Sequence, residues 1–133
     1  MVNYLAVLVA AVAAYGIGFL WYGPLFGKKW MALMKVSDKD IEKAKQKGMA
    51  KSYAITFVTT LVTAYVLAWF VAYVGMTPAG GAMTGALIWL GFMATSGVGM
   101  VLWDNKPWAL YALNMGHSLL SLVVMGLIVG AWA

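Results

Sequence analysis

Four long runs of apolar residues set the pattern of hydrophobic and polar positions along the chain. The runs cover residues 2–22, 53–74, 80–102 and 108–132, and none of them contains a Lys, Asp or Glu. A helix needs roughly 20 apolar residues to cross a bilayer core of about 30 Å. Because backbone polar groups left unpaired in lipid are costly, each run is predicted to be a helix rather than an open strand. We therefore expect an all-α fold, an integral membrane four-helix bundle, in a single transmembrane domain over residues 1–133.

The composition supports a membrane location. Hydrophobic residues make up 64% of the chain and charged residues only 10%, so too few polar side chains remain to cover a soluble domain. No basic segment precedes the first run, which is therefore expected to be a retained helix rather than a signal peptide. The absence of cysteine excludes disulfides, thiolate metal sites and cysteine nucleophiles.

The lysines indicate how the helices are oriented. Eight of the nine lysines lie between residues 24 and 51, and the ninth, Lys106, lies between the last two runs. These two connections are on the same side of a four-helix chain, and the positive-inside rule places both in the cytoplasm and both termini outside. We expect a multi-pass protein of the bacterial inner membrane, with the lipid bilayer as its partner and anionic headgroups near the lysines. Membrane orientation explains the lysines, so no nucleic-acid partner is predicted.

The connection over residues 24–51 is predicted to be helical, with an interfacial part and a solvated part. Pro24 cannot donate a backbone hydrogen bond and disfavours helix at the residue before it, so the first helix should stop there. A short amphipathic helix at the interface is expected next, with a plain structured loop as the alternative. Its apolar positions are Phe26, Trp30, Leu33 and Met34. Ser37 and Asp40 form a capping-box pattern that predicts a solvated helix from Asp38.

Aromatic residues gather where the predicted helices meet the cytoplasmic interface. Tryptophan and tyrosine concentrate at this level because one end of the side chain is apolar and the other end can reach water. We therefore predict interface anchors at Trp21, Tyr22, Trp30, Trp103 and Trp108.

Glycines recur at spacings of about four residues in the third and fourth runs, and a stripe of small residues in the first run includes one glycine. Such stripes allow two helices to approach closely, and packing rather than hydrophobicity drives association in lipid. The third run is accordingly the best candidate for the centre of the bundle or for a seam between two copies. The predicted helix-packing glycines are Gly18, Gly81, Gly85, Gly91, Gly99, Gly126 and Gly130.

Polar side chains inside the second, third and fourth runs form the candidate site. Intramembrane polar groups are functional hypotheses by default. The alternative is that these groups hydrogen-bond between helices, and that threonine hydroxyls bond to the preceding turn of their own helix. The candidate polar pocket comprises Thr56, Thr60, Thr95, Ser96, Asn114, His117, Ser118 and Ser121.

No pattern in the chain predicts catalysis. His117 is the sole histidine, so a metal centre would lack ligands and a haem would need a second copy of the chain. No phosphate-binding loop, paired intramembrane carboxylates or nucleophile triad order occurs. We expect a non-enzymatic protein with no metal and no cofactor.

Two segments carry a resemblance to a known family. Residues 21–30 read WYGPLFGKKW, and a closing pattern runs from residues 106–108 through 125–126 to 131–132. In this order they resemble the small bacterial membrane proteins grouped as domain of unknown function 1761, over nearly the whole chain. Gly23 departs from the small polar residue expected at that position. The resemblance implies a small membrane protein of about four helices and supplies no catalytic residues.

Three functions follow as hypotheses. The first is a non-enzymatic membrane protein that self-associates, or joins a larger complex, through its glycine-rich faces. The second is an oligomeric transporter or channel for a small solute, lined by the threonine, asparagine and histidine side chains. The third is a lipid- or cofactor-binding protein with a groove formed around Trp21, Tyr22 and Trp30.

Overall fold

The structure, a computed structural model, describes residues 3–35, 37–75 and 77–132. Within these ranges the chain is helical and contains no β-strand. Four helical segments are long and apolar enough to cross a membrane, and they run over Tyr4–Leu25, Ala50–Val74, Pro78–Leu102 and Trp108–Ala131. These bounds are close to the predicted runs. The all-α class is confirmed, and the protein is a multi-pass membrane protein.

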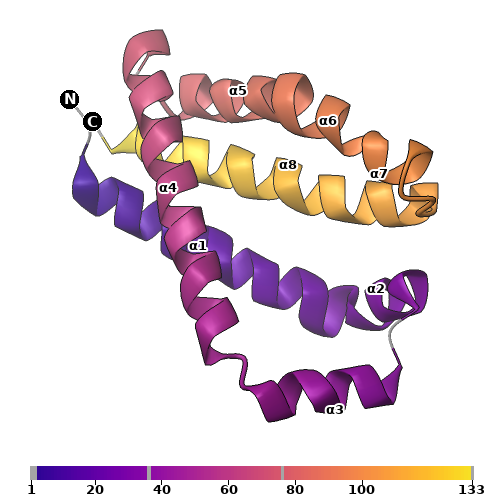
Figure 1. The fold of residues 1–133 in the computed structure, drawn as a ribbon. Coiled ribbons are helices and arrows are strands. Elements are labelled where there is room, and N and C mark those ends of the chain that lie inside the picture. The colour runs from indigo at the N-terminus through magenta and orange to yellow at the C-terminus, as the bar shows by residue number, and fades with distance from the viewer. Residues whose placement is uncertain (1–2, 36, 76, 133) are drawn as a thin grey trace.

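The helices form a bundle of four spans with two further helices in the long connection. The elements in order are α1 (Tyr4–Leu20), η1 (Trp21–Leu25), α2 (Gly27–Met34), α3 (Asp38–Lys47), α4 (Ala50–Val74), α5 (Pro78–Ile88), η2 (Trp89–Ala94), α6 (Thr95–Gly97), α7 (Gly99–Leu102) and α8 (Trp108–Ala131). Helices α1 and α8 lie side by side, α5 packs along α8, and α4 crosses α1 at a steep angle (Figure 1). Both ends of the chain lie at the same end of the bundle (Figure 1). An even number of spans requires this arrangement.

Small side chains fill the centre of the bundle. The main cluster of buried residues joins alanines of α1 and α4 to larger residues of α4 and α8, and its members include Ala10, Ala11, Ala14, Ala64, Leu67, Ala68, Val71, Leu122, Met125 and Val129. Because lipid tails are as apolar as these side chains, the helices are held by close packing and not by exclusion from water. Alanine at the contact lets the helix backbones come near enough for that packing.

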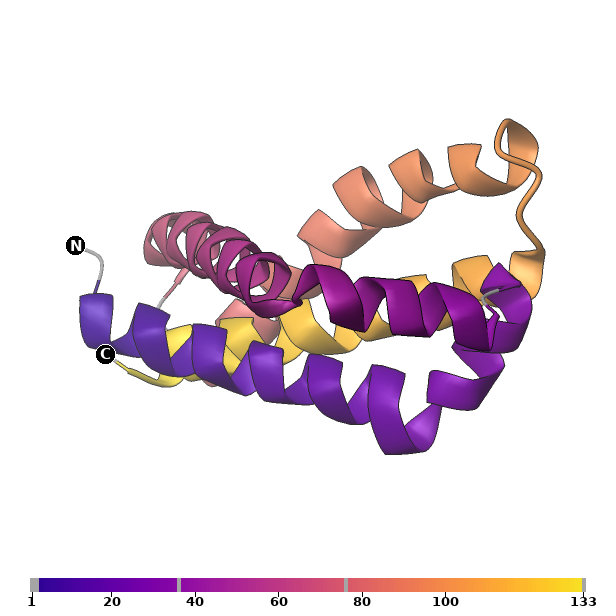
Figure 2. The same ribbon diagram turned by 60° about the horizontal axis from the view of Figure 1, so that its bottom comes forward.

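The predicted close crossing of glycine faces lies within the chain, between α5 and α8. A Cβ atom added at Gly81 would overlap the carbonyl oxygen of Gly126, and one added at Gly126 would overlap the carbonyl oxygen of Gly81. Gly85 and Gly130 meet the partner helix's backbone in the same way. Beyond this contact the third span diverges from α8, so that its α6–α7 end stands away from it (Figure 2). Four of the seven predicted packing glycines therefore serve the fold of a single chain.

Two of the spans contain a turn of π-helix, and each π-turn begins with a tryptophan tied to α8. The indole N–H of Trp21 donates to the carbonyl oxygen of Leu113 at 3.0 Å, and that of Trp89 donates to the carbonyl oxygen of Met115 at 2.8 Å. The prediction that the first helix stops at Pro24 is confirmed by the backbone, because Gly23, the residue before the proline, has φ −107° and ψ −106° and is not helical. The η1 turn spans this kink and extends the first span to Leu25.

The connection after the first span is helical, as predicted. The capping box is present, since the Ser37 N–H donates to Asp40 Oδ2 at 3.0 Å and the Asp40 N–H donates to Ser37 Oγ at 3.2 Å. The hydrogen bonds from the Ser37 backbone and hydroxyl lower the pKa of Asp40. The carboxylate is therefore the form that caps α3 at neutral pH, and the cap is lost as the pH falls through this lowered pKa. Gly48, at φ +81°, then separates α3 from α4.

Candidate functional site

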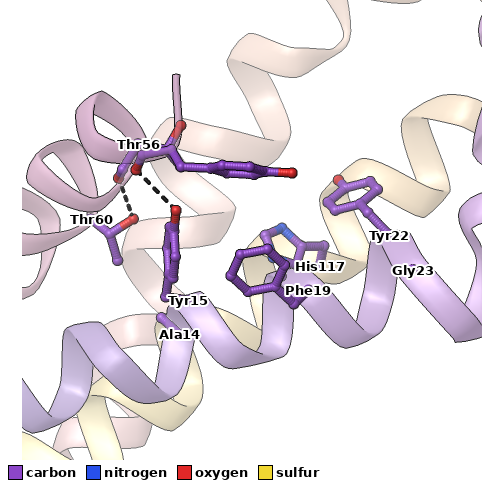
Figure 3. Close-up of a pocket in the computed structure, with 10 residues that line it drawn as sticks. Ala14, Tyr15, Phe19, Tyr22, Gly23, Thr56, Thr60 and His117 are labelled. Atoms are coloured by element: carbon purple, nitrogen blue, oxygen red, sulfur yellow. Dashed lines mark hydrogen bonds between the residues drawn. The ribbon is translucent and has the colours of Figure 1, made fainter. Parts of the chain in front are cut away.

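A groove between α1 and α4 brings together aromatic and hydroxyl side chains from both helices. Its volume is about 470 Å³, and the α1–α4 groove is lined by Ala14, Tyr15, Gly18, Phe19, Tyr22, Gly23, Tyr53, Thr56, Thr60 and His117. Figure 3 shows these walls: rings from α1 on one side, the threonines of α4 on the other, and His117 reaching in from α8.

The sequence of α1 places three rings on the face that borders the groove. Tyr15, Phe19 and Tyr22 are four and three residues apart, so they project from one side of a helix. Tyr15 and Phe19 meet edge to face with ring centroids 4.9 Å apart. Phe19 also lies against Tyr53 of α4, with centroids 5.6 Å apart. Ring contacts of this kind stabilise the side chains in one arrangement along the groove.

His117 enters the groove opposite Gly18 of α1. A Cβ atom at Gly18 would lie 3.4 Å from His117 Nε2, which is an ordinary contact distance, so a side chain longer than that of alanine would press on the imidazole. The same nitrogen lies 3.3 Å from Ser121 Oγ, with the direction of the hydrogen bond set by the tautomer. The imidazole packs against Tyr22 with ring centroids 4.9 Å apart. Thus Gly18, expected to serve a helix contact, makes room for a polar ring.

The hydroxyl groups of the groove are mostly bonded to backbone. The Tyr15 hydroxyl donates to the Tyr53 carbonyl oxygen at 2.9 Å (Figure 3). Thr56 and Thr60 donate to carbonyl oxygens of their own helix at 2.7 and 2.8 Å, which is the alternative that the sequence left open for threonine. The Tyr22 hydroxyl crosses to α8 and donates to Asn114 Oδ1 at 2.8 Å.

The eight residues of the predicted polar pocket are divided among several places. Thr56, Thr60 and His117 line the α1–α4 groove, and the buried Ser121 supports His117. The remaining four lie elsewhere: Asn114 in an adjoining cavity of about 390 Å³ with Tyr22 and Trp30, Ser118 bonded to the Asn114 carbonyl, and Thr95 and Ser96 exposed on α6. Thr95 is bonded to the Gly91 carbonyl oxygen of its own span. One pocket from all eight residues is therefore not formed.

Sequence reasoning missed the aromatic half of the site. Tyr15, Phe19 and Tyr53 line the groove but were not among the candidate residues. The spacing of Tyr15, Phe19 and Tyr22 on one helical face was the signal that could have found two of them. Tyr53 carries no such signal, because its place opposite Phe19 depends on the crossing of α4 over α1.

The predicted interface anchors fall into two groups. Trp103 and Trp108 are exposed, at 82% and 55% of their surface, and for them an anchoring role stays a prediction. Trp21 and Tyr22 instead point into the bundle, where both donate hydrogen bonds to α8. Trp30 packs against Tyr22, with ring centroids 6.0 Å apart. These three residues tie η1 and α2 to the rest of the fold.

Two of the predicted packing glycines, Gly91 and Gly99 of the third span, do not face a neighbouring helix closely within the described residues. Among the described residues nothing lies within 4 Å of a Cβ atom added at Gly91, and the atom nearest to one at Gly99 is in the ring of Trp103 of the same span. Within the described residues, a Cβ atom added at either position would therefore meet no other helix. Any close approach at these positions would have to come from outside the chain.

No group of three or more His, Cys, Asp or Glu side chains lies close enough to hold a metal ion within the described residues. The chemistry that the groove offers is therefore that of rings, hydroxyl oxygens and one imidazole. These groups can bind a ligand by packing, hydrogen bonds and attraction to ring faces.

Comparison with known proteins gives a family. The chain matches the family described as "Protein of unknown function (DUF1761)" over residues 5–130, which is nearly its whole length. No curated protein and no solved structure matches the chain. The match reaches all four spans and the three connections between them, as the resemblance of the two sequence segments implied, and the chain therefore belongs to the DUF1761 family.

Proposed function

We propose that this protein is a non-enzymatic membrane protein that binds a small amphipathic molecule in the α1–α4 groove. The observation that carries the proposal is the groove itself, about 470 Å³ with walls of aromatic rings and Thr56 and Thr60. Binding sites for small molecules are concave and mostly apolar, with a few polar groups that fix orientation. Among the three hypotheses from the sequence, the geometry favours ligand binding. The groove that supports it is lined by Tyr15, Phe19 and His117 and does not include Trp21 or Trp30.

The groove has features that suit a molecule arriving from the bilayer. Phe19 and Tyr53 remain about half exposed on the outer surface of the bundle, so a lipid-dissolved molecule can reach the groove without opening the core. Gly23, where the first span kinks, lines the same groove and leaves its end uncovered by a side chain. An acyl chain could lie along the rings while a polar head reaches the hydroxyl oxygens.

Filling the groove is expected to abolish binding. Thr56→Trp places a large side chain in the groove, whereas Thr59→Trp changes a neighbouring exposed threonine of the same helix that does not line it. Both hydroxyls bond only to their own helix, so both variants should fold. A neutral photoreactive monoacylglycerol in lipid nanodiscs should cross-link to α1 and to the first half of α4 in the parent protein and in Thr59→Trp, and should lose these cross-links in Thr56→Trp.

Mass spectrometry of the digested protein locates the cross-links. Equal labelling of the groove peptides in Thr56→Trp and Thr59→Trp would refute the proposed function. So would labelling that is confined to other surfaces of the protein.

Self-association is a second candidate, and one observation favours it. Gly91 presents open space on the third span, which a second copy could approach. We expect Gly91→Leu to shift the protein toward the monomer in native mass spectra from mild detergent, while Gly16→Leu, at an equally open glycine of α1, leaves the distribution unchanged. An unchanged distribution for Gly91→Leu would remove this candidate. The glycines of the α5–α8 crossing give it no support, since they are occupied within the chain.

We propose that the protein lies in the bacterial inner membrane with the lysine-rich connection in the cytoplasm and both termini outside. The distribution of lysines supports this orientation. Because the chain has no cysteine, single cysteines can report it. In spheroplasts, a membrane-impermeant thiol reagent should label Ala79→Cys at the start of α5 and spare Lys39→Cys in α3, and inverted vesicles should give the opposite result. The reversed pattern would overturn the orientation.

A further inference from the structure

We infer that the α1–α4 groove selects an amphipathic organic ammonium cation. The inference rests on the proposed function, because it names the chemical class of the molecule that the groove would bind. Two independent features carry it: hydroxyl groups whose hydrogens are already engaged, and aromatic rings with exposed surface.

All five hydroxyl groups that line the groove donate their hydrogen to the protein. Those of Tyr15, Tyr22, Thr56 and Thr60 donate to three backbone carbonyl oxygens and the side-chain oxygen of Asn114, and that of Tyr53 donates to Met49 Sδ at 3.9 Å. A hydroxyl that has donated its hydrogen can offer a ligand only its lone pairs. The oxygens of the groove therefore face a ligand as acceptors, which suits a positively charged or hydrogen-donating head and disfavours a phosphate or a carboxylate.

The rings of the groove carry the same electrostatic preference. A cation within about 6 Å of an aromatic ring centroid is attracted by the negative face of the ring. Phe19 and Tyr53 have centroids 5.6 Å apart, so one cation that lies beside the pair, over their exposed ring surface, can be close to both. Tyr15 adds a third ring, 4.9 Å from that of Phe19. Quaternary ammonium groups are bound by aromatic cages in this way, without a carboxylate.

The residues that line the groove carry no formal charge that would repel such a head. No lysine and no acidic residue is among the groove-lining residues within the described part of the chain. Apart from the single imidazole of His117, an anionic head would meet no basic side chain among these residues, while a cationic head meets ring faces and lone pairs. The apolar tail of the same molecule would lie against Ala14 and the ring of Phe19.

A competition experiment tests the inference with the photoreactive monoacylglycerol described above. The competitors are the choline ester of a saturated fatty acid and the dimethylbutyl ester of the same acid, in which a carbon atom replaces the nitrogen. They have the same shape and differ in charge. At equal mole fractions in the nanodisc, we expect half-displacement of the probe at a concentration at least about fivefold lower for the choline ester.

Two ring variants and one control distinguish binding of the cationic head from binding of the apolar tail. Phe19→Leu and Tyr53→Leu should each reduce the advantage of the choline ester by about two- to fivefold and change displacement by the neutral ester little. Tyr73→Leu, which removes an exposed tyrosine of α4 away from the groove, should change neither.

The ammonium preference and groove binding can fail separately in these experiments. Equal displacement by the two esters, or ring variants that leave the advantage of the choline ester unchanged, overturns the ammonium preference while groove binding stands. If the probe does not label the groove in the parent protein, the proposed function and the ammonium preference fail together.

Discussion

Gly126→Val is expected to disrupt the pairing of α5 with α8 and to destabilise the protein strongly. A Cβ atom at this position would overlap the carbonyl oxygen of Gly81, and that oxygen belongs to backbone that cannot turn aside. The two helices would have to separate. We expect a loss of about 3 kcal/mol or more in the free energy of unfolding, the upper part of the range for overpacked cores. Titration of the purified protein with sodium dodecyl sulfate, followed by circular dichroism, measures this loss.

Gly16→Val in α1 is the matched control. It makes the same change inside a transmembrane helix, but at a glycine where the described residues leave the added side chain free. Its transition should stay close to that of the parent protein. If Gly126→Val unfolds at the same detergent fraction as Gly16→Val, then α5 and α8 do not cross as closely as the structure has them.

Trp21→Ala is expected to loosen the kinked end of the first span. The indole of Trp21 donates to the Leu113 carbonyl oxygen, lies over Gly116 and packs against Phe26 at a centroid distance of 4.6 Å. Since the side chain is only partly buried, we expect a loss of about 3 kcal/mol, the lower end of the range for replacing a core tryptophan by alanine. Trp21→Phe, which retains an aromatic ring and loses the hydrogen bond, should lose about 1 kcal/mol.

Trp103→Ala controls for the removal of a tryptophan as such. Trp103 is 82% exposed, so its replacement should change the free energy of unfolding by no more than about 0.5 kcal/mol. The same detergent titration ranks the three variants. A Trp21→Ala protein as stable as Trp103→Ala would mean that the indole does not hold η1 to α8.

Much of the fold could be predicted because the bilayer imposes simple rules on a sequence. Long apolar runs identified the four spans, and the Ser37–Asp40 pattern identified the start of α3 from local hydrogen bonding alone. Pro24 likewise identified the break in the first span from a local effect, since Gly23 before it is not helical. The sequence did not show that the kinked turn is held through Trp21, which is hydrogen-bonded to a helix more than ninety residues later in the chain.

The candidate site was predicted in part. Residue type indicated Thr56, Thr60 and His117, since polar groups within apolar runs stand out. Residue type could not separate them from Thr95 and Ser96, which lie on another face of the bundle. The aromatic walls were missed because tyrosine and phenylalanine are ordinary in membrane helices, and only their convergence on one groove distinguishes Phe19 and Tyr53 from the rest.

The sequence by itself determined that the chain is helical, that it crosses a membrane four times, and which family it resembles. These properties depend on apolar length, on local capping and on short motifs, all of which are written in neighbouring residues. Only the tertiary structure decided which glycines pair within the chain, where α4 crosses α1, and that His117 lies beside Gly18 among the groove's rings. The physical reason is that helices in lipid choose their partners by the fit of their surfaces, and that fit depends on residues far apart in the sequence.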